Sequence, residues 1–582
     1  MPADFDPFTI EIVRDKLSAA ADEMGVVLAR ASMSPIVYEV LDFACGITDA
    51  SAQVIAQTNG LTLFTGTFGP QVQSVVEKFG VDNLHEGDVF ATNISYDGGT
   101  HTSDVCLIKP IFFESRIVGF GVSVTHWIEI GGAVAGSIPP DATEIYQEGL
   151  RLPGIRVVEA GVTNQTVLDI IEANIRLPIT GIGDLNAGLA AVGIAERRVV
   201  EACERYGVEL VDATFEHILE HGERVARAAL REIPNGVYAA EDLIDGDGIT
   251  DDPIPIKVTV TVADESLHAD FTGSAPQTRG PINCAAGALL SACKTVVRAI
   301  TDPQAKSNDG FFRPLTITIP PGTIFSAEAP APTGWYYESA SCANDLFWKA
   351  LAPIVPDRLG AGSYMSLSAA YLIGTERESG ELFVLAEPNI GGWGGSALGD
   401  GENALIATTD GDTYNFPVEV VETRYPVLME RYELDTESGG GAGMNRGGLG
   451  CVREYRLYGV DDASGYGSCS GARRAPWSLE GGSPGSHNYL EYNQAGNAYR
   501  VGRTPKVALA DGDRAMVVTA AGGGFGDPLE REPERVLNDV VDGYVPLARA
   551  CEDYGVVIDP KSMTVDVSAT DELRAERRDV SG

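Results

Sequence analysis

The sequence is short of basic residues, and of lysine above all. Its 582 residues include 83 Asp and Glu against 42 Lys and Arg, which gives a formal net charge of −41 at pH 7. Only nine of the basic residues are lysine. Nucleic acid is bound through Lys and Arg that displace counterions from phosphates, and anionic lipid attracts the same residues. We therefore expect neither nucleic acid nor a membrane surface as a partner.

Long apolar runs and paired cysteines are also missing. No apolar run approaches the roughly 20 residues of a membrane-spanning helix, and the first residues lack the basic and apolar regions of a secretory leader. The nine cysteines are scattered without a CxxC pair, which argues against a disulfide framework and against a zinc ribbon. We expect a cytosolic protein whose cysteines are mostly buried.

Glycine, by contrast, is abundant. The 67 glycines cluster in particular loops and show no collagen-like period. We interpret them as turns between strands and as places where a ligand approaches the backbone. With 44% hydrophobic and 21% charged residues, the remainder has the composition of a large globular protein.

The hydrophobic pattern predicts a mixed α+β fold, a large multi-layer subunit with helical N-terminal segments and a strand- and Gly-rich C-terminal half. We expect three regions: an N-terminal metal-site domain (1–235), a middle α/β region (236–380) and a β-rich, Gly-rich C-terminal region with a terminal helix (381–582). Helical spacing is found over 8–31, 186–230 with a break at Gly207, 282–300 and, as the last such pattern, 533–551. Strand-like segments are found between Tyr38 and Ile130, over 254–274 as a hairpin, and over 314–322.

Two of the seven histidines have acidic neighbours suited to metal binding. His101 follows the Gly98-Gly99 turn, Asp104 lies three residues later, and His126 lies in a predicted strand. Together they offer nitrogen and oxygen ligands to a divalent cation. Asp42 stands in an apolar run, where an unpaired carboxylate is costly, and is a candidate fourth ligand. The residues alone leave open the alternative of hydrogen-bonded core histidines and turn carboxylates.

Other motifs point to different chemistry. His217–His221 spells HxxEH, the inverted zincin motif, on a predicted helix whose alternating acids and bases also fit a solvated face. Cys284 stands near a helix start, but no histidine is tied to it, and a buried thiol is the alternative. The glycine loops match neither a P-loop nor a dinucleotide fingerprint, and no GxSxG elbow is present.

A series of longer segments follows in order along the chain. They include YEVLDFACGITD, YDGGTHTSDV, EIGGAVAGSIP, YQEGLRLPG, SNDGFFRPLTITIPPGT, NIGGWGG, FPVEVVETRYPVLMERYELDTESGGGAGMNRGGLG, PWSLEGGSPG and GGGFGDPLEREPERVLNDVVDGYV. In number and order they resemble the B-type subunit of the hydantoinase/oxoprolinase family. That family also contains caprolactamase and the large subunits of acetone and acetophenone carboxylases.

The resemblance implies that Asp42, His101, Asp104 and His126 hold a divalent metal, zinc in the first place and manganese or iron as alternatives. It implies that ATP is bound by a separate A-type subunit and not by this chain, in a hetero-oligomer such as A2B2. The partner would phosphorylate the carbonyl oxygen of a cyclic amide, and metal in this chain would activate the water that opens the ring. Glu129 and Glu148 are hypothetical orienting residues or general bases.

Two departures from the family pattern concern the substrate. Family members often carry NDP where this chain has Asn93-Ile94-Ser95, and often HHxD where it has His126-Trp127-Ile128-Glu129. We expect Trp127 and Glu129 to reshape the pocket wall. The sequence therefore predicts an ATP-dependent hydrolase subunit for a hydantoin, 5-oxoproline or related lactam. The alternatives are a ketone carboxylase subunit, a non-catalytic scaffold and a stand-alone peptidase.

Overall fold

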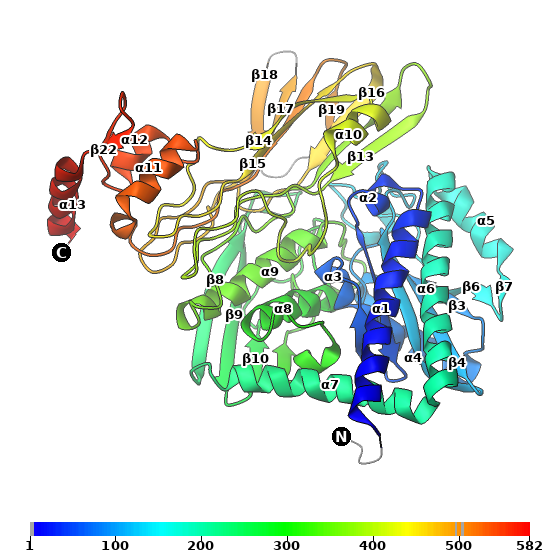
Figure 1. Ribbon diagram of the computed structural model, residues 1–582. Helices are drawn as coiled ribbons and strands as arrows, with labels where there is room; N and C mark the ends of the chain where they lie inside the picture. The colour runs from blue at the N-terminus through cyan, green and yellow to red at the C-terminus, as the bar shows by residue number, and fades with distance from the viewer. Residues whose placement is uncertain (1–4, 495–496, 502–505, 582) are drawn as a thin grey trace. The chain divides into compact units, whose positions relative to one another are not determined.

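The computed structural model describes residues 5–494, 497–501 and 506–581. The chain forms two compact units, Met1–Phe347 with Thr408–Phe416 and Trp348–Ala407 with Pro417–Gly582. Of the three predicted regions, 1–235 and most of 236–380 lie in the first unit. The mixture of helices with several sheets confirms the predicted α+β class (Figure 1).

The first unit is built on a seven-stranded antiparallel sheet and a smaller four-stranded sheet. In spatial order the larger sheet is β2 (Val54–Gln57), β1 (Phe43–Asp49), β5 (Arg116–His126), β4 (Asp104–Phe113), β3 (Val89–Thr92), β6 (Ile155–Glu159) and β7 (Val162–Thr163). The smaller is β11 (Leu315–Thr318), β10 (Ser266–Asp270), β9 (Ile254–Ala263) and β8 (Gly236–Ile244). Its helices are α1 (Pro7–Ala31), α2 (Pro35–Tyr38), α3 (Thr62–Thr65), α4 (Phe68–Phe79), α5 (Gln165–Asn174), α6 (Pro178–Tyr206), α7 (Val208–Leu230), α8 (Ala286–Ile300) and, up to Phe347, α9 (Tyr336–Leu351).

The predicted N-terminal helix is confirmed as α1, and its sequence explains its start. The Asp6 side chain accepts from the amides of Phe8 and Thr9, and Pro7 occupies the first turn, where its missing N–H costs nothing. The apolar face of α1 is buried beside α6, as Figure 1 shows for the blue and cyan helices. The predicted break at Gly207 also occurs, because this glycine, with φ of +85°, separates α6 from α7.

Helix α6 corrects one expectation. By length and composition it could cross a membrane, although we expected no such segment. Half of its most apolar stretch is buried inside the unit. Helix α6 packs on β4 and β5, where Leu185 and Val192 join a core with Leu107 and Trp127. Its apolar residues are therefore accounted for by packing within the first unit.

The second unit contains two larger sheets, a two-stranded ribbon and a helical C-terminal part. The four-stranded sheet has the order β13 (Leu382–Glu387), β12 (Ala370–Glu376), β16 (Val460–Gly467) and β19 (Val507–Leu509). The five-stranded sheet has the order β14 (Val427–Leu434), β15 (Cys451–Leu457), β20 (Arg514–Val518), β17 (Tyr489–Gln494) and β18 (Asn497–Val501). The ribbon consists of β21 (Ile558–Asp559) and β22 (Thr564–Val565). The helices are α10 (Val418–Arg424), α11 (Pro533–Val541), α12 (Leu547–Glu552) and α13 (Val567–Ser581).

Helix α13 was missed by the sequence pattern, which placed the last helix near 533–551. Its sequence, VSATDELRAERRDVS, is mostly polar and carries few apolar residues at helical spacing. Helix α4 is a second departure, because it interrupts the region expected to be sheet between Tyr38 and Ile130. The expectation of mostly buried cysteines is confirmed, since eight of the nine are buried and only Cys551 is exposed, and none forms a disulfide. Burial raises the pKa of the Cys284 thiol, which makes it a poor nucleophile.

The glycine-rich loops of the second unit run side by side and hydrogen-bond to one another (Figure 1). The Gly522 amide donates to the Gly448 carbonyl oxygen over 2.9 Å, and the Gly395 amide donates to that of Gly523 over 2.8 Å. A Cβ atom on Gly522 would lie 2.1 Å from the carbonyl oxygen of Trp393. Close approach of another backbone, which we did not expect, therefore explains many glycines of this bundle. The predicted turn role fits others, since Gly439, Gly440, Gly481 and Gly526 have positive φ.

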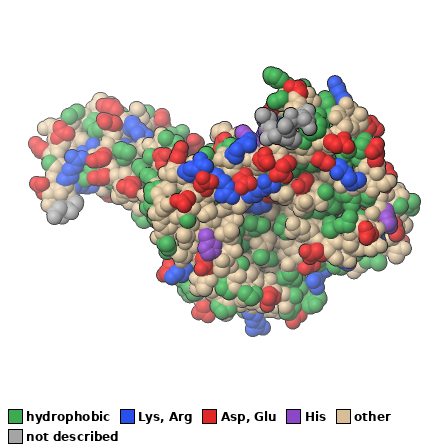
Figure 2. Space-filling model, turned by 90° about the horizontal axis from the view of Figure 1, so that it is seen from below, with side chains coloured by type: hydrophobic (Ala, Val, Ile, Leu, Met, Phe, Trp, Pro, Cys, Tyr) green, Lys and Arg blue, Asp and Glu red, His purple; other side chains and the backbone are tan. Residues whose placement is uncertain are grey.

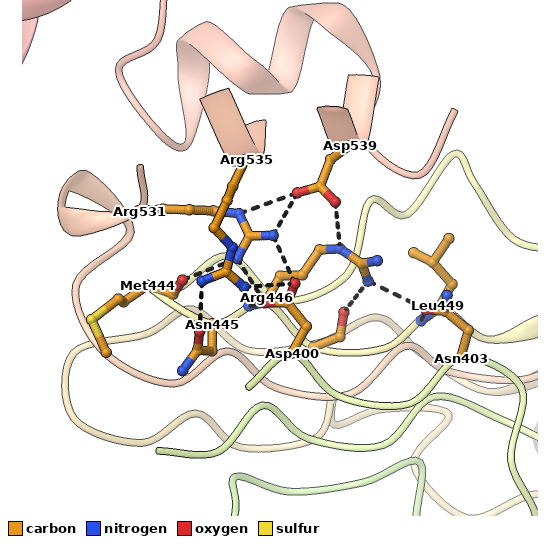
Figure 3. Close-up of polar contacts among 10 residues, drawn as sticks. Asp400, Asn403, Met444, Asn445, Arg446, Leu449, Arg531, Arg535 and Asp539 are labelled. Atoms are coloured by element: carbon orange, nitrogen blue, oxygen red, sulfur yellow. Dashed lines mark hydrogen bonds and ion pairs between the residues drawn. The ribbon is translucent and has the colours of Figure 1, made fainter. Parts of the chain in front are cut away.

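A buried charge network fastens α11 to these loops (Figure 3). The Arg531 guanidinium, 1% exposed, donates to Asp400 over 2.6 and 2.8 Å and to Asp539 over 2.7 Å. Arg446 also donates to Asp539, over 3.3 Å. Arg535 also pairs with Asp400, over 3.0 Å. Three arginines thus neutralise the two aspartates, and removing one partner of such a buried pair is costly.

The acidic excess is not gathered into one block. Figure 2 shows Asp and Glu side chains over the whole of one face, with Lys and Arg among them. Many are paired, as in the contact of Arg198 with Glu23 over 2.7 Å. The charge therefore acts as a diffuse field, which disfavours a free anion near the surface.

The glycine bundle yields a stability prediction. The change Gly522→Ala should destabilise the second unit by about 1–3 kcal/mol, because the new methyl group overlaps a carbonyl oxygen. The change Gly399→Ala is the matched control, because a Cβ atom added to Gly399 would have nothing within 4 Å. Guanidinium unfolding curves measure both, and equal midpoints would contradict the close-packing explanation.

Candidate metal centre

Three neighbouring strands of the larger sheet meet at one end. Asp104 begins β4 and is paired directly with His126, the last residue of β5. The His126 amide donates to the carbonyl oxygen of Asp42, just before β1, over 3.1 Å. Directly paired residues of antiparallel strands point to the same face. The register of β1, β5 and β4 therefore brings residues from three segments to one edge.

The side chains of His101, Asp104 and His126 converge there. His101 Nε2 lies 2.9 Å from Asp104 Oδ1 and 3.2 Å from His126 Nδ1. His126 Nδ1 lies 2.9 Å from the same Asp104 oxygen. All three residues are buried, and their ligand atoms lie within 4.8 Å of one another. Across 5–494, 497–501 and 506–581, no other group of three His, Cys, Asp or Glu residues is so placed.

Surrounding groups fix the orientation of these ligands. His101 Nδ1 lies 2.9 Å from the Gly334 carbonyl oxygen. Because a carbonyl oxygen only accepts, Nδ1 carries the proton and Nε2 presents its lone pair to the centre. Asp104 Oδ2 accepts from the Thr100 hydroxyl over 2.5 Å and from the Tyr336 hydroxyl over 3.2 Å. These bonds leave Asp104 Oδ1 to face the two imidazoles.

Two further acidic side chains interact electrostatically with these residues. Burial raises the pKa of Asp42 to about 8. The nearby His126 lowers this pKa, whereas the charges of Asp410 and Asp104 raise it. Burial raises the pKa of Asp410 to about 6, against the hydrogen bond from Thr413. Asp104 is the opposite case, because His101 and His126 overcome burial and hold its pKa well below the usual range.

A divalent cation fits this donor set. Asp42 Oδ1 is buried and has no hydrogen-bond partner among the described residues, and buried carboxylates are stable only when paired or metal-bound. Two imidazole nitrogens with carboxylate oxygens suit zinc, manganese or iron. Asp42 lies outside the group held within 4.8 Å, so its place as fourth ligand stays a prediction. Sequence reasoning missed Asp410, whose segment Thr408–Phe416 joins the first unit only through folding.

Glu129 is held by several donors. It is 1% exposed and accepts from the Gly131 amide and the Ser137 hydroxyl, both over 2.8 Å, and from Arg176 Nη1 over 2.6 Å. The guanidinium neutralises its charge. These contacts favour a positioning role over that of a general base, and the choice between the two stays a prediction.

Glu148 is held differently. Its Oε1 accepts from the Gly334 amide over 2.7 Å, and Gly334 is also the residue that orients His101. Its Oε2 is buried, and none of the residues that the structure describes forms a hydrogen bond with it. Burial raises the pKa of Glu148 to about 8, against the hydrogen bonds from Gly334 and Thr333. A carboxyl group with this pKa can both take up and release a proton near neutral pH.

Residues in the two segments that depart from the family pattern have structural roles, although Asn93 itself matches that pattern. Asn93 donates to the carbonyl oxygens of Thr102 and Leu150, and its own oxygen accepts from the Leu152 amide over 2.6 Å. It thereby ties the histidine loop to the loop that follows Glu148. Trp127 is 2% exposed and lies in the core rather than on a pocket wall, contrary to expectation.

The HxxEH residues lie elsewhere in the first unit. His217 and His221 stack on α7 with ring centroids 6.4 Å apart. They line a separate pocket of about 420 Å³ together with Arg14 and Lys306. Within the described part of the chain no carboxylate joins them in a group of three potential ligands. The geometry therefore gives a zincin-type centre no support.

Comparisons with known proteins agree on one family. Residues 6–528 match the hydantoinase B/oxoprolinase family. The chain is 34% identical to the B component of a putative D-/L-hydantoinase of Pseudomonas sp. (strain NS671), over 98% of both chains. It is 31% identical to the beta chain of the caprolactamase of Pseudomonas jessenii, over 98% of this chain and 99% of that one.

Two solved structures share the fold. The ATP-dependent caprolactamase from Pseudomonas jessenii superposes with a TM-score of 0.91 and 29% identity, over 98% of this chain and 100% of the other. A nucleotide-free acetone carboxylase superposes with a TM-score of 0.93 over 99% of this chain and 83% of the other. At 20% identity, the second likeness concerns the fold alone.

The cluster predicts a metal-binding stoichiometry. We expect one divalent metal per chain, and less than about a tenth of that in His101→Ala, Asp104→Ala or His126→Ala, because each change removes a buried ligand. Elemental analysis of the purified chain measures this. The control is His85→Ala, which changes an exposed histidine. Full metal content in all three variants would disprove the site.

Proposed function

The chain belongs to the hydantoinase B/oxoprolinase family, and on that basis we propose that it is the metal-dependent catalytic subunit of an ATP-dependent cyclic-amide hydrolase. Its substrate is a lactam or hydantoin that a separate A-type subunit has phosphorylated. The observation that carries the proposal is the buried convergence of His101, Asp104 and His126. Both Pseudomonas relatives are named as one subunit of a larger enzyme, which supports a partner subunit in a complex.

The chemistry divides between a bound cation and the chain's own residues. A divalent metal held by His101, Asp104 and His126 supplies Lewis acidity and lowers the pKa of a bound water. The Gly334 carbonyl and the Thr100 hydroxyl keep the ligand atoms aimed at one point. Glu148 holds a proton at Oε2 or accepts one from the attacking water. Burial on all sides excludes bulk solvent from the reacting groups.

The partner and the compartment complete the proposal. ATP is bound by the A-type subunit, and the two chains form a hetero-oligomer such as A2B2 in the cytosol. The lack of disulfides among the nine cysteines supports a reducing compartment. Direct transfer of the phosphorylated substrate suits a chain of net charge −41, which repels a free anionic intermediate.

The assembled complex provides the test of substrate class. With the partner, ATP and a panel of cyclic amides and ketones, we expect ATP-dependent ring opening that is lost in Asp104→Ala. Bicarbonate-dependent turnover of a ketone without ring opening would replace the hydrolase with a carboxylase. Full activity of metal-free Asp104→Ala would leave only a scaffold role.

Glu148 provides a pH prediction. As a general base it must be ionised, so with a pKa of about 8 the rate should rise about tenfold per pH unit below that value and level off above it. Glu148→Gln should lower kcat about 100-fold or more and abolish this rise. The control Glu172→Gln changes an exposed carboxylate of α5. An unchanged pH profile in Glu148→Gln would remove Glu148 from the mechanism.

A further inference from the structure

A second pocket of the first unit, about 430 Å³ in volume, has a wall rich in polar side chains. It lies between the segment from Gln57 to Gly66, which includes α3, and one face of α8. Helix α8 contributes Ser291, Lys294, Thr295 and Arg298 to the wall, at three- and four-residue steps. Hydroxyl and basic groups on one helix face are suited to an anion rather than to an apolar ligand.

One chain segment connects this pocket with the candidate metal centre. Gly411 and Asp412 line the pocket, and the preceding Asp410 interacts electrostatically with His126 and Asp104. The shared segment is fixed to α3, because the Thr62 hydroxyl donates to the Thr409 carbonyl oxygen over 2.7 Å. The same short segment therefore contributes residues to the pocket wall and a carboxylate that interacts with the metal ligands.

Arg298 is a cation in the wall that forms no close ion pair with the described residues. Lys294, by contrast, is paired with Asp309 over 2.7 Å. The Arg298 guanidinium stacks 3.9 Å from the Phe311 ring centre, and its Nη2 donates to the Ala305 carbonyl oxygen over 2.7 Å. Its Nη1 is buried without a hydrogen-bond partner in the described part of the chain. Burial lowers the pKa of Arg298 to about 10, so the group is still charged at pH 7.

We propose that this pocket binds a phosphoryl dianion, with Arg298 as the anchoring residue. The inference rests on the proposed function, in which a phosphorylated substrate reaches this chain and phosphate leaves it. An arginine offers paired donors to phosphate oxygens, and the hydroxyls of Thr295 and Ser291 line the same wall. In a chain of net charge −41, a phosphate needs such a local cation.

Titration of the purified full chain with inorganic phosphate tests the pocket without ATP or a partner. We expect saturable binding by calorimetry, weakened about tenfold or more in Arg298→Gln. Arg231→Gln is the matched control, because Arg231 pairs with Glu265 at the end of α7 and does not line the pocket. Absent binding to the wild type, or equal binding to Arg298→Gln, would overturn the proposal.

A second variant, Arg298→Lys, controls for the case in which Arg298→Gln does not fold. Arg298→Lys keeps the charge above Phe311 but has fewer fixed donors, so thermal unfolding should be near wild type and phosphate affinity intermediate. Wild-type affinity in a folded Arg298→Lys would argue against guanidinium recognition and overturn that assignment.

Kinetics of the complex distinguish the two sources of the phosphoryl group. If the pocket holds the activated substrate, Arg298→Lys should raise KM and the ATP consumed per ring opened. If it holds released phosphate, the variant should only weaken inhibition by added phosphate. A folded variant with neither change would overturn the proposal. Absence of any lactam or ketone turnover by the wild type would count against the proposed function. The phosphate titration would still test the pocket in that case, because it needs no turnover.

Discussion

Buried carboxylates around two imidazoles are the constraint on which the first unit depends. Asp104 and Asp410 are almost inaccessible to solvent, and Asp42 has a buried oxygen without a partner in the described part of the chain. Each would be costly to bury as an isolated charge. The chain nevertheless directs them to one region through strand register and fixes Asp104 with two hydroxyl donors. A bound cation would stabilise these carboxylates together.

The cost of placing negative charges close together also applies outside the metal centre. The surface carries a diffuse negative field, so anionic intermediates are favoured only where the chain supplies a local positive charge. In our proposal the metal ligands hold one such charge and Arg298 supplies another. The Thr408–Phe416 segment contributes to both regions, because Asp410 interacts with His126 and Asp104 while Gly411 lines the pocket. A partner that delivers the substrate directly avoids the repulsive field altogether.

The second unit depends on backbone rather than side-chain chemistry. Its glycine loops satisfy their amides across one another at distances that no Cβ atom would tolerate. The helical C-terminal part is joined to these loops by ion pairs of Asp400 and Asp539 with three arginines, Arg446, Arg531 and Arg535. This explains an abundance of glycine that neither nucleotide loops nor simple turns account for.

The sequence by itself determined the local structure and three clustered side chains. Periodicity located α1, the break at Gly207 and the β9–β10 hairpin, because local spacing decides which face is apolar. His101 and Asp104 were found because they stand three residues apart beside a glycine turn. Tertiary structure alone decided the rest. Asp410, the Gly334 carbonyl and Arg298 take their places from distant segments, and Trp127 turned inward to the core. Their positions depend on strand register and chain crossing, which no short pattern records.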